Sequence, residues 1–361
     1  MIKCKKFDRF FRIIICLGII IVLGTAVVFV ARAIANSRVK DFWGDETYGL
    51  EGTTRTATYN QLLTYGARGQ GSAAPLDYIF VKFLDSAYKS SFANIPHNIY
   101  YRLNSIFWDL IGGVLIAFLY LRAFYRKADS KWIIVIQVIL ICFALMIFYF
   151  KRDNMNFAVQ MRPYALWNSL WYVMLGLVML RGVSMWLLLA GIFLALTSNG
   201  ALIQIPVLAF AQFFFRIIDR EKFLDIGIGT AIIFILPFFI AVFYALHADK
   251  FSYINSPLDY QQYSHEFLSF WMSKWRVLVL SVAGILLTVW NRQWRGCTIV
   301  FLTMLILYCA APAINRVILS TSFFFTSRQY LYFDLTFPLF YLMLALVLPE
   351  YWQMILNKWK I

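Results

Sequence analysis

The chain has 361 residues, of which 61% are hydrophobic and only 14% are charged, whereas soluble domains carry about 45–50% apolar and about 25% charged residues. This composition excludes an ordinary soluble protein and predicts an integral membrane protein. The formal charge is +15, but Lys and Arg stand mostly in short groups beside apolar segments, as the positive-inside rule expects of membrane proteins. We therefore expect no nucleic-acid partner.

A membrane-spanning helix needs about 20 mostly apolar residues, and about ten segments approach that pattern. They lie at residues 11–33, 103–123, 132–150, 164–180, 183–199, 201–217, 226–246, 276–290, 297–311 and 330–348. The segments from 164 to 217 are joined by a few residues each and must form hairpins. The expected fold is an all-α polytopic membrane protein, with one transmembrane domain over residues 1–361 and no soluble C-terminal domain.

The basic residues before the first apolar segment place the N-terminus in the cytoplasm. They are Lys3, Lys5, Lys6, Arg9 and Arg12. Ala33 and Ala35 resemble a signal-peptidase site, but the preceding segment has spanning length, so an uncleaved anchor is preferred to a cleaved signal. If the helices alternate, both termini are cytoplasmic, in the inner (plasma) membrane, and the long loops face outward. These loops are residues 34–102, 151–163, 247–275 and 312–329.

The large first loop, residues 34–102, contains a helical pattern of apolar residues. The pattern consists of Leu76, Ile79, Phe80, Phe83, Leu84 and Ala87. An amphipathic helix of this kind would lie along the membrane interface. The alternative is an ordinary amphipathic helix that packs on the bundle.

An acidic stretch, VKDFWGDETYGLEG, follows the first apolar segment and holds the adjacent carboxylates Asp45 and Glu46. A carboxylate that reaches a hydroxyl can act as a general base. Because adjacent side chains diverge, one could face a substrate while the other holds a metal or an Arg. The alternative for both is a solvated loop.

Two basic and aromatic motifs stand where outward-facing loops enter apolar segments. In QMRPYALWNSLW, Pro163 suits a helix start, and Arg162 beside it opposes the helix dipole unless it binds an anion such as phosphate. The alternative is an Arg that reaches lipid headgroups. The second motif, TSRQYLYFDLTFP, holds Arg328 and Tyr330.

Intramembrane carboxylates and cysteines add little to these motifs. Asp109 and Asp334 lie within apolar segments, where a carboxylate usually faces a cavity or a partner. The five cysteines form no CxxC pair and the three histidines show no ligand spacing, so the sequence indicates neither a disulfide framework nor a zinc site.

Together the motifs FWGDETY, GQGSAAPLDYIFVKF, QMRPYAL and RQYLYFDLTFP resemble the GT-C superfamily of membrane glycosyltransferases. The resemblance is to the branch of protein O-mannosyltransferases and the lipid A aminoarabinose transferase, a family 39-like glycosyltransferase. Members place an Asp-Glu pair in a large outer loop. Where they have a His-Pro segment, this chain has Ala73 and Ala74, so a family-type metal site is in doubt.

The resemblance implies transfer of a sugar from a polyprenyl-phosphate donor to a lipid, glycan or protein acceptor in the cell envelope, with inversion. It implies Asp45 and Glu46 as catalytic acids, with Glu46 holding a divalent metal if one is used. It also implies a set of donor-phosphate ligands and a candidate second acid. The phosphate ligands are Arg162, Tyr164, Arg328 and Tyr330, and the second acid is Asp153.

Two other readings remain open. A transporter or flippase of a lipid-linked substrate would also use intramembrane Asp109 and Asp334, but it would not need Asp45 and Glu46 and commonly shows internal repeats. A non-catalytic GT-C-like assembly protein would keep the fold without the chemistry. Membrane lipids are expected partners in all three readings.

Overall fold

The computed structural model describes residues 8–67, 74–125, 131–180, 184–217, 223–247, 260–291, 294–317, 339–347 and 351. All regular structure within these residues is helical, and none of them forms a strand. The prediction of an all-α fold is therefore confirmed.

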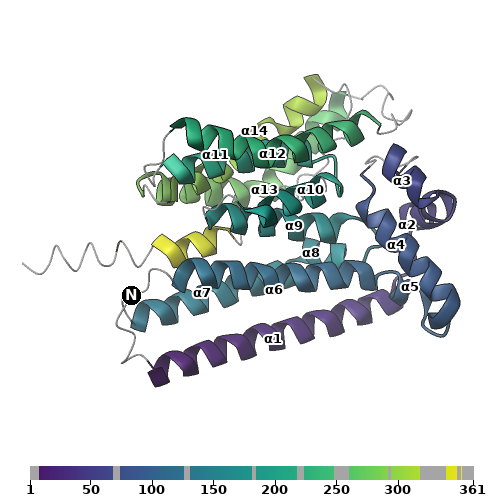
Figure 1. Cartoon of the computed structure of the whole chain (residues 1–361), viewed down its shortest axis with the longest axis horizontal. Helices are drawn as coiled ribbons and strands as arrows, with labels where there is room; N and C mark the ends of the chain where they lie inside the picture. The colour runs from purple at the N-terminus through teal and green to yellow at the C-terminus, as the bar shows by residue number, and fades with distance from the viewer. Residues whose placement is uncertain are drawn as a thin grey trace, which may run out of the picture.

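Long helices run side by side along the long axis of the molecule and form a bundle (Figure 1). They are α1 (Asp8–Val39), α6 (Leu103–Tyr125), α7 (Lys131–Phe150), α9 (Tyr164–Met179), α10 (Met185–Ala195), α11 (Ala201–Ile217), α12 (Phe223–Leu246), α13 (Tyr260–Val289), α14 (Arg295–Val317) and a helical stretch at residues 339–347. A helix thus stands at each apolar segment that the sequence predicts to be helical.

Four of these helices are long and apolar enough to cross a membrane. The four stretches are Cys16–Val39, His97–Leu119, Leu224–Leu246 and Trp271–Val289. The other apolar helices are shorter: α10, with 11 residues, rises only about 16 Å at 1.5 Å per residue, against a hydrocarbon thickness of about 30 Å. Ten full spans therefore remain a prediction.

Helix α13 corrects one predicted loop. Residues 247–275 were expected to form an outward-facing loop, but α13 begins at Tyr260, so residues 260–275 are helical. The stretch carries Gln, His, Glu and Lys residues, and residues 260–270 lie outside the apolar stretch Trp271–Val289. It contains neither Gly nor Pro, and those are the residues that most strongly disfavour a helix.

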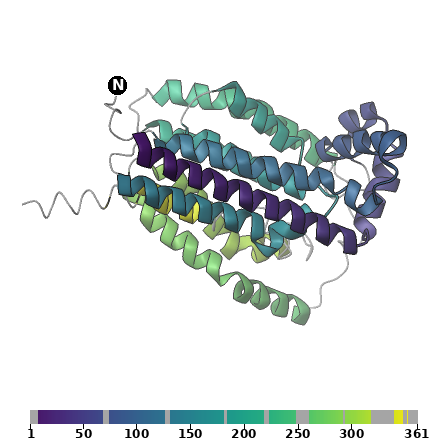
Figure 2. The ribbon, with the colours of Figure 1, turned by 90° about the horizontal axis from the view of Figure 1, so that it is seen from below.

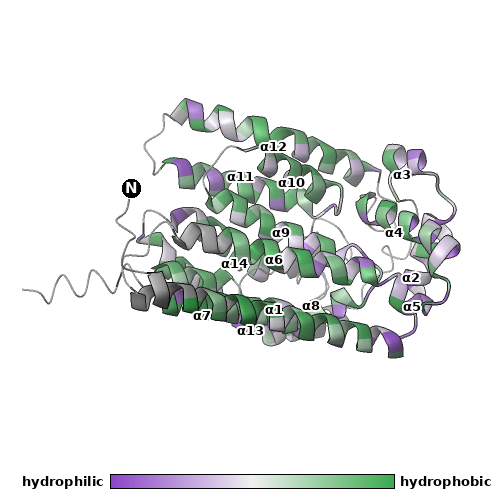
Figure 3. Cartoon of the chain, turned by 60° about the horizontal axis from the view of Figure 1, so that its bottom comes forward, coloured by the Kyte–Doolittle hydropathy of each residue, from purple (hydrophilic) through white to green (hydrophobic). Residues whose placement is uncertain are grey.

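Residues 40–67 and 74–102 form a compact layer at one end of the bundle, here called the end cap (Figures 1 and 2). Its helices are α2 (Gly44–Tyr48), α3 (Tyr59–Tyr65), α4 (Leu76–Ala87) and α5 (His97–Tyr100), with π-helical turns η1 (Gly49–Thr54) and η2 (Tyr88–Phe92). Hydrophilic residues are prominent in the end cap, whereas the bundle is largely hydrophobic (Figure 3). The bounds of α4 confirm the amphipathic helix predicted over residues 76–87.

Hydrogen bonds join the end cap to three separate parts of the bundle. The Leu76 amide donates to the Leu196 carbonyl just after α10, at 2.8 Å. The Tyr244 hydroxyl near the end of α12 donates to the Leu63 carbonyl, at 2.6 Å. The turn before α9 is bonded to α2, as described below. If successive helices alternate in direction, residue 76, residue 196 and residue 244 all belong to the same face of the membrane. The hydrogen bonds place these residues at the same end of the bundle.

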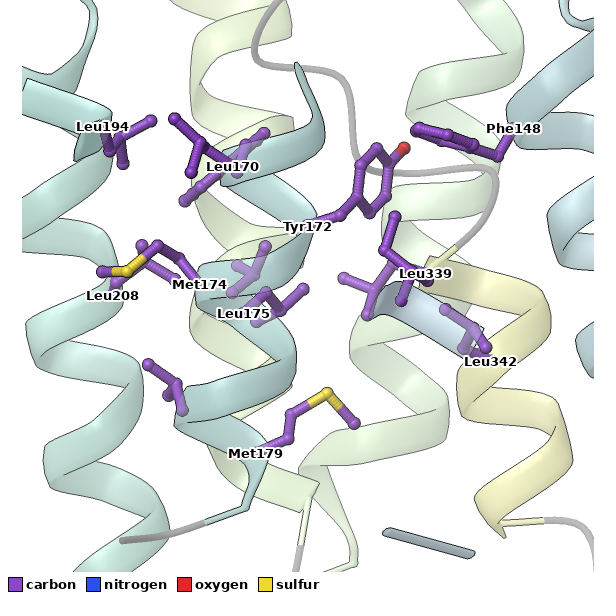
Figure 4. Close-up of a cluster of buried hydrophobic side chains, with 14 of the residues drawn as sticks. Phe148, Leu170, Tyr172, Met174, Leu175, Met179, Leu194, Leu208, Leu339 and Leu342 are labelled. Carbon is purple, nitrogen blue, oxygen red and sulfur yellow. The ribbon is translucent and has the colours of Figure 1, made fainter. Parts of the chain in front are cut away.

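Helix α9 is the centre of the core. Figure 4 shows its side chains between those of α7, α10, α11 and residues 339–347, with Leu194 and Leu208 on one side and Phe148, Leu339 and Leu342 on the other. Tyr172 packs edge-on against Phe148 with ring centroids 5.3 Å apart. Nearly all of α9 is buried, as expected of a helix surrounded by other helices.

Helix α6 packs most extensively against α9. The contact depends on Gly112, where a Cβ atom would overlap the side chain of Ser169. At Gly113 a Cβ atom would overlap the Tyr149 hydroxyl of α7. Small residues at helix interfaces let backbones approach closely, as is common in membranes.

The outer surface of the bundle is apolar. On α1, Ile20 is 63% exposed and Val27 is 68% exposed, and on α12 Ile232 and Phe239 are similarly open. Monomeric soluble proteins rarely expose contiguous apolar surface of this kind. The surface suits a hydrocarbon solvent, as the membrane prediction requires.

Candidate functional site

The site is built around a contact between Asp45 and Arg162, two residues that the sequence singled out separately. Asp45 lies in the first turn of α2, and Arg162 lies two residues before α9. The Arg162 Nη2 atom is 3.8 Å from Asp45 Oδ2, and the side chains are 14% and 56% exposed, respectively. An almost enclosed cation therefore meets a solvent-facing carboxylate at a distance too long for a strong hydrogen bond.

Glu46, the neighbour of Asp45, is fully buried in an ion pair with Arg102. Arg102 donates from Nη2 to Glu46 Oε2 at 2.9 Å and from Nε to Oε1 at 3.2 Å, and both side chains have 0% exposure. Such a two-point contact between a guanidinium and a carboxylate is the strong, geometrically specific form of this pair.

The same carboxylate also accepts two backbone hydrogen bonds. The Met161 amide donates to Glu46 Oε1 at 2.7 Å, and the Trp43 amide donates to Oε2 at 3.2 Å. Since Met161 precedes Arg162 directly, Glu46 fixes the turn that carries Arg162 relative to the helix that carries Asp45. The structure thus encloses Glu46 as a positioning group, away from a substrate or a solvent-facing metal.

Arg102 closes the end of α1 as well. Its guanidinium donates to the carbonyl oxygens of Ser37, Lys40 and Asp41. The Ser37 carbonyl lies in the last turn of α1 and the other two follow the end of the helix, where a positive charge is favourable. Sequence reasoning did not identify Arg102, because an Arg at the edge of an apolar segment is ordinary and the pairing with Glu46 is tertiary.

Two tyrosines complete the surroundings of Arg162. Its guanidinium lies over the Tyr164 ring, 5.7 Å from the centroid, and is hydrogen-bonded to that side chain. Burial would lower the pKa of Arg162, but Tyr78, Tyr164 and Asp45 outweigh it and raise the pKa above its ordinary value. Burial also raises the pKa of Tyr78, although the positive charge of Arg162 opposes this. The guanidinium of Arg162 stays charged, and the Tyr78 hydroxyl stays neutral.

A second carboxylate near Arg162, Asp77, was missed from the sequence. It lies in the first turn of α4 and is 2% exposed, and its Oδ1 accepts a 2.8 Å hydrogen bond from Asn104 Nδ2. Burial raises the pKa of Asp77 to about 6, while the Asn104 hydrogen bond and the positive charge of Arg162 act to lower it. An Asp in the first turn is a usual helix-start residue, so the sequence gave no sign of its burial.

The other predicted site residues lie wholly or partly outside the described part of the structure. Arg328, Tyr330 and Asp334 lie outside the described residues. Asp153 belongs to α8 (Arg152–Ala158), the short helix before the Arg162 turn, but its side chain also lies outside the described part of the structure.

A divalent metal finds no matching ligand set in the part of the chain that the structure describes. No three His, Cys, Asp or Glu side chains gather there in a way that could hold a metal ion. Both Glu46 oxygens are already engaged by Arg102 and by backbone amides. The described residues around Glu46 therefore do not fit a metal centre.

A separate polar group lies inside the bundle. Asp109 of α6 is 1% exposed, and Ser169 of α9 donates to its Oδ1 over a long 3.4 Å. Its Oδ2 is buried without a hydrogen-bond partner among the described residues. The structure therefore does not bring Asp109 into the cluster around Arg162.

Comparison of the chain with protein-family models, with curated proteins and with solved structures finds no match in any of the three.

Proposed function

We propose that the chain is a GT-C-like membrane glycosyltransferase, which moves a sugar from a polyprenyl-phosphate donor to a hydroxyl group of a lipid, glycan or protein. The observation that carries this proposal is the contact of Asp45 with Arg162. A base and a phosphate-binding cation in one place are the two groups that such a transfer needs.

In this proposal the chain crosses the inner (plasma) membrane about ten times, with both termini in the cytoplasm and the end cap on the extracytoplasmic side. The meeting of the end cap with the ends of α10 and α12 supports an alternating arrangement. The shorter helices would reach the interface with the help of local bilayer thinning. A site at the end of the bundle suits a donor whose lipid tail stays in the bilayer.

The transfer is a displacement at the anomeric carbon of the donor sugar. The acceptor oxygen forms a bond to that carbon while its proton passes to the Asp45 carboxylate. The bond from the carbon to the phosphate oxygen breaks, and its electron pair stays on the lipid phosphate, which leaves as an anion. Attack opposite the leaving group inverts the anomeric centre.

Arg162 stabilises the charge that develops on the leaving phosphate, with hydroxyl groups around it as further donors. Binding of the phosphate to Arg162 releases Asp45 from its long ion pair and leaves its carboxylate open to the acceptor. Tyr164 contacts Arg162 directly, and the resemblance adds Arg328 and Tyr330. Asp153 remains a candidate second acid on the same ground.

Glu46 acts in this proposal through position. Its bonds to Arg102 and Met161 set the distance from α2 to the Arg162 turn. Removing the Glu46 carboxylate would therefore displace Arg162, although Glu46 itself takes no part in the reaction.

The alternative is a transporter or flippase for a lipid-linked substrate, and one observation favours it. Asp109 is a buried carboxylate with a single long hydrogen bond among the described residues, and such groups often mark transport pathways. A non-catalytic assembly protein is the third reading.

The test uses the purified full chain with a panel of polyprenyl-phosphate sugars, measuring sugar transfer and release. We expect Asp45→Asn to lower the rate about 10²–10⁴-fold, the usual contribution of a general base. Asp41→Asn removes an exposed carboxylate of the same loop and should leave the rate unchanged. Undiminished transfer by Asp45→Asn would refute its role as base, and lipid movement across vesicles without any sugar transfer would favour the flippase.

A further inference from the structure

One face of the helical stretch from Gly44 to Thr54, which comprises α2 and η1, is open to solvent. The opposite face is buried, since Glu46 is enclosed and Leu50 packs in a hydrophobic cluster with residues of α4 and of the turn before α9. The open face carries Asp45, the proposed base, and Tyr48, which is 51% exposed. Residues three apart in a helix are neighbours, with Cβ atoms about 5–6 Å apart, so Tyr48 lies beside Asp45.

The Tyr48 ring lies flat on the backbone of Gly52. A Cβ atom placed on Gly52 would be 3.2, 3.1 and 3.4 Å from three consecutive ring carbons, Cδ2, Cε2 and Cζ. A ring that met this position with its edge would leave the third carbon much farther away, so the face of the ring covers the glycine. Because residue 52 has no side chain to push the ring aside, one face of the ring is fixed against the helix. The other face points away from the helix and accounts for most of the exposure of Tyr48.

The groups around Tyr48 on the open face are charged. Glu51 and Arg55 form an ion pair there, with side chains that are 56% and 31% exposed, and Arg55 is held in place by a second bond to Asp85. An interfacial tyrosine that anchors a membrane protein combines an apolar neighbourhood with a polar tip. A ring beside carboxylates and a guanidinium is instead surrounded by groups that bind hydroxyls.

We propose that the outer face of Tyr48 binds the ring of an acceptor sugar, so that the acceptor of the transfer is a glycan. One side of a pyranose ring presents mainly C–H groups, whose partial positive charge matches the negative face of an aromatic ring. The hydroxyls project from the edge of the sugar, where Glu51 accepts and Arg55 donates hydrogen bonds. A sugar on Tyr48 also lies beside Asp45, so that one of its hydroxyls reaches the base. This inference rests on the proposed function, because it takes Asp45 as that base.

The experiment measures the binding of methyl α-mannopyranoside, methyl β-glucopyranoside, methyl β-galactopyranoside and methyl β-xylopyranoside to the full chain by saturation-transfer difference NMR. The chain is held in phosphatidylcholine nanodiscs, because a glycoside detergent would compete for the ring. Mannitol is the control ligand, since it has the hydroxyls of a hexose but no rigid ring. We expect saturation of the C–H protons on one side of at least one glycoside, and none for mannitol.

Substitutions at Tyr48 test whether the aromatic face is the binding element. Tyr48→Ala should raise the Kd of the bound glycoside about tenfold, the upper end of what an aromatic contact contributes. Tyr48→Phe keeps the ring and should bind like the wild-type chain, whereas Tyr48→Leu keeps only apolar bulk and should bind like Tyr48→Ala. Tyr59→Ala is the matched control, because Tyr59 is a second exposed tyrosine of the end cap, at 43%, and its loss should leave the Kd unchanged.

Three results would overturn the inference. Binding retained in Tyr48→Leu would show a merely apolar contact, such as a lipid makes. An equal loss in Tyr59→Ala would show that any surface tyrosine serves. A wild-type chain that binds none of the four glycosides has no sugar platform at all.

A transfer assay with the same glycosides separates this inference from the proposed function. Release of sugar from polyprenyl-phosphate donors by the wild-type chain, with water as acceptor, tests the proposed function by itself. With a glycoside as acceptor, Tyr48→Ala should raise its KM about tenfold. Release without any dependence of glycoside binding on Tyr48 overturns this inference and leaves the proposed function standing. Binding at Tyr48 without release from any donor overturns the proposed function, and with it the acceptor role of Tyr48.

Discussion

The ion pair between Glu46 and Arg102 allows a sharp test of what holds the candidate site together. The perturbation is Glu46→Gln, which keeps the size of the side chain and removes its charge. Arg102 is fully buried, so its guanidinium would lose its partner Glu46 and keep its charge in an enclosed site. Breaking a buried pair by removing one partner costs about 3–5 kcal/mol.

The hydrogen bonds that Glu46 accepts from backbone amides indicate a loss of stability of similar size. A neutral amide presents one acceptor oxygen and one NH2 group, whereas Glu46 accepts from Met161 and Trp43 through different oxygens. The backbone N–H of either Met161 or Trp43 would therefore face the NH2 group of the new Gln side chain and lose its acceptor. An unsatisfied buried group of this kind costs about 1–3 kcal/mol. The two costs overlap because they concern one side chain, so we keep the estimate of about 3–5 kcal/mol.

The assay is thermal unfolding of the detergent-solubilised chain, followed by tryptophan fluorescence at a fixed scan rate. At about 2 °C per kcal/mol, the value for larger domains, the apparent Tm of Glu46→Gln should fall by about 6–10 °C. Glu51→Gln is the matched control, because Glu51 forms a largely exposed pair with Arg55. Exposed pairs contribute about 0–1 kcal/mol, so its Tm should stay within about 2 °C.

A double-mutant cycle identifies the cause. If the isolated charge is responsible, Arg102→Met combined with Glu46→Gln should cost less than the sum of the two single changes. Equal Tm values for Glu46→Gln and the wild-type chain would refute the argument that this pair holds the end cap.

Two further predictions concern packing and pH. Gly112→Ala should lower stability by about 1–3 kcal/mol, because its Cβ atom would overlap Ser169, whereas Gly24→Ala, with no atom within 4 Å of its Cβ, should leave the apparent Tm unchanged or slightly raised. Hydrogen bonds from Lys89, Tyr101 and Arg55 outweigh burial and lower the pKa of Asp85 to about 2, so its stabilising contribution is complete above pH 3.8 and is lost as the pH falls to about 2. Burial raises the pKa of Asp77 to about 6, so the contribution of Asp77 to stability is greatest below pH 3.8 and is lost as the pH rises through 6. Melting temperatures measured against pH should therefore lack the loss near pH 6 in Asp77→Asn and the loss between pH 3.8 and about 2 in Asp85→Asn.

Apolar patterning predicted the helices of the bundle because a buried or lipid-facing helix must be apolar along its length. It also predicted α4, since Leu76, Phe80 and Ala87 recur at helical spacing. The start of α13 at Tyr260 was missed because the prediction rested on apolar segments. A helix can continue through polar residues, whereas a membrane span cannot.

The candidate site was predictable only in part. Asp45 and Arg162 could be selected one at a time, as an acid in an outer loop and a cation that opposes a helix dipole. Their contact, the burial of Glu46 against Arg102 and the enclosure of Asp77 depend on which segments pack together. Local sequence carries no information on those distances, so the role of Glu46 could not be distinguished from that of Asp45.

Asp45 is exposed and makes one long contact, whereas its neighbour Glu46 is buried and holds the turn before α9. This difference has a consequence for how the site can change over evolution. The geometry at Arg162 is maintained by Glu46, Arg102 and backbone amides, and the 3.8 Å contact of Asp45 contributes little to it. Asp45 can therefore be altered without loosening the contacts that hold the turn before α9. Substitutions at Asp45 would be tolerated by the fold, whereas substitutions at Glu46 or Arg102 would be removed by selection for folding.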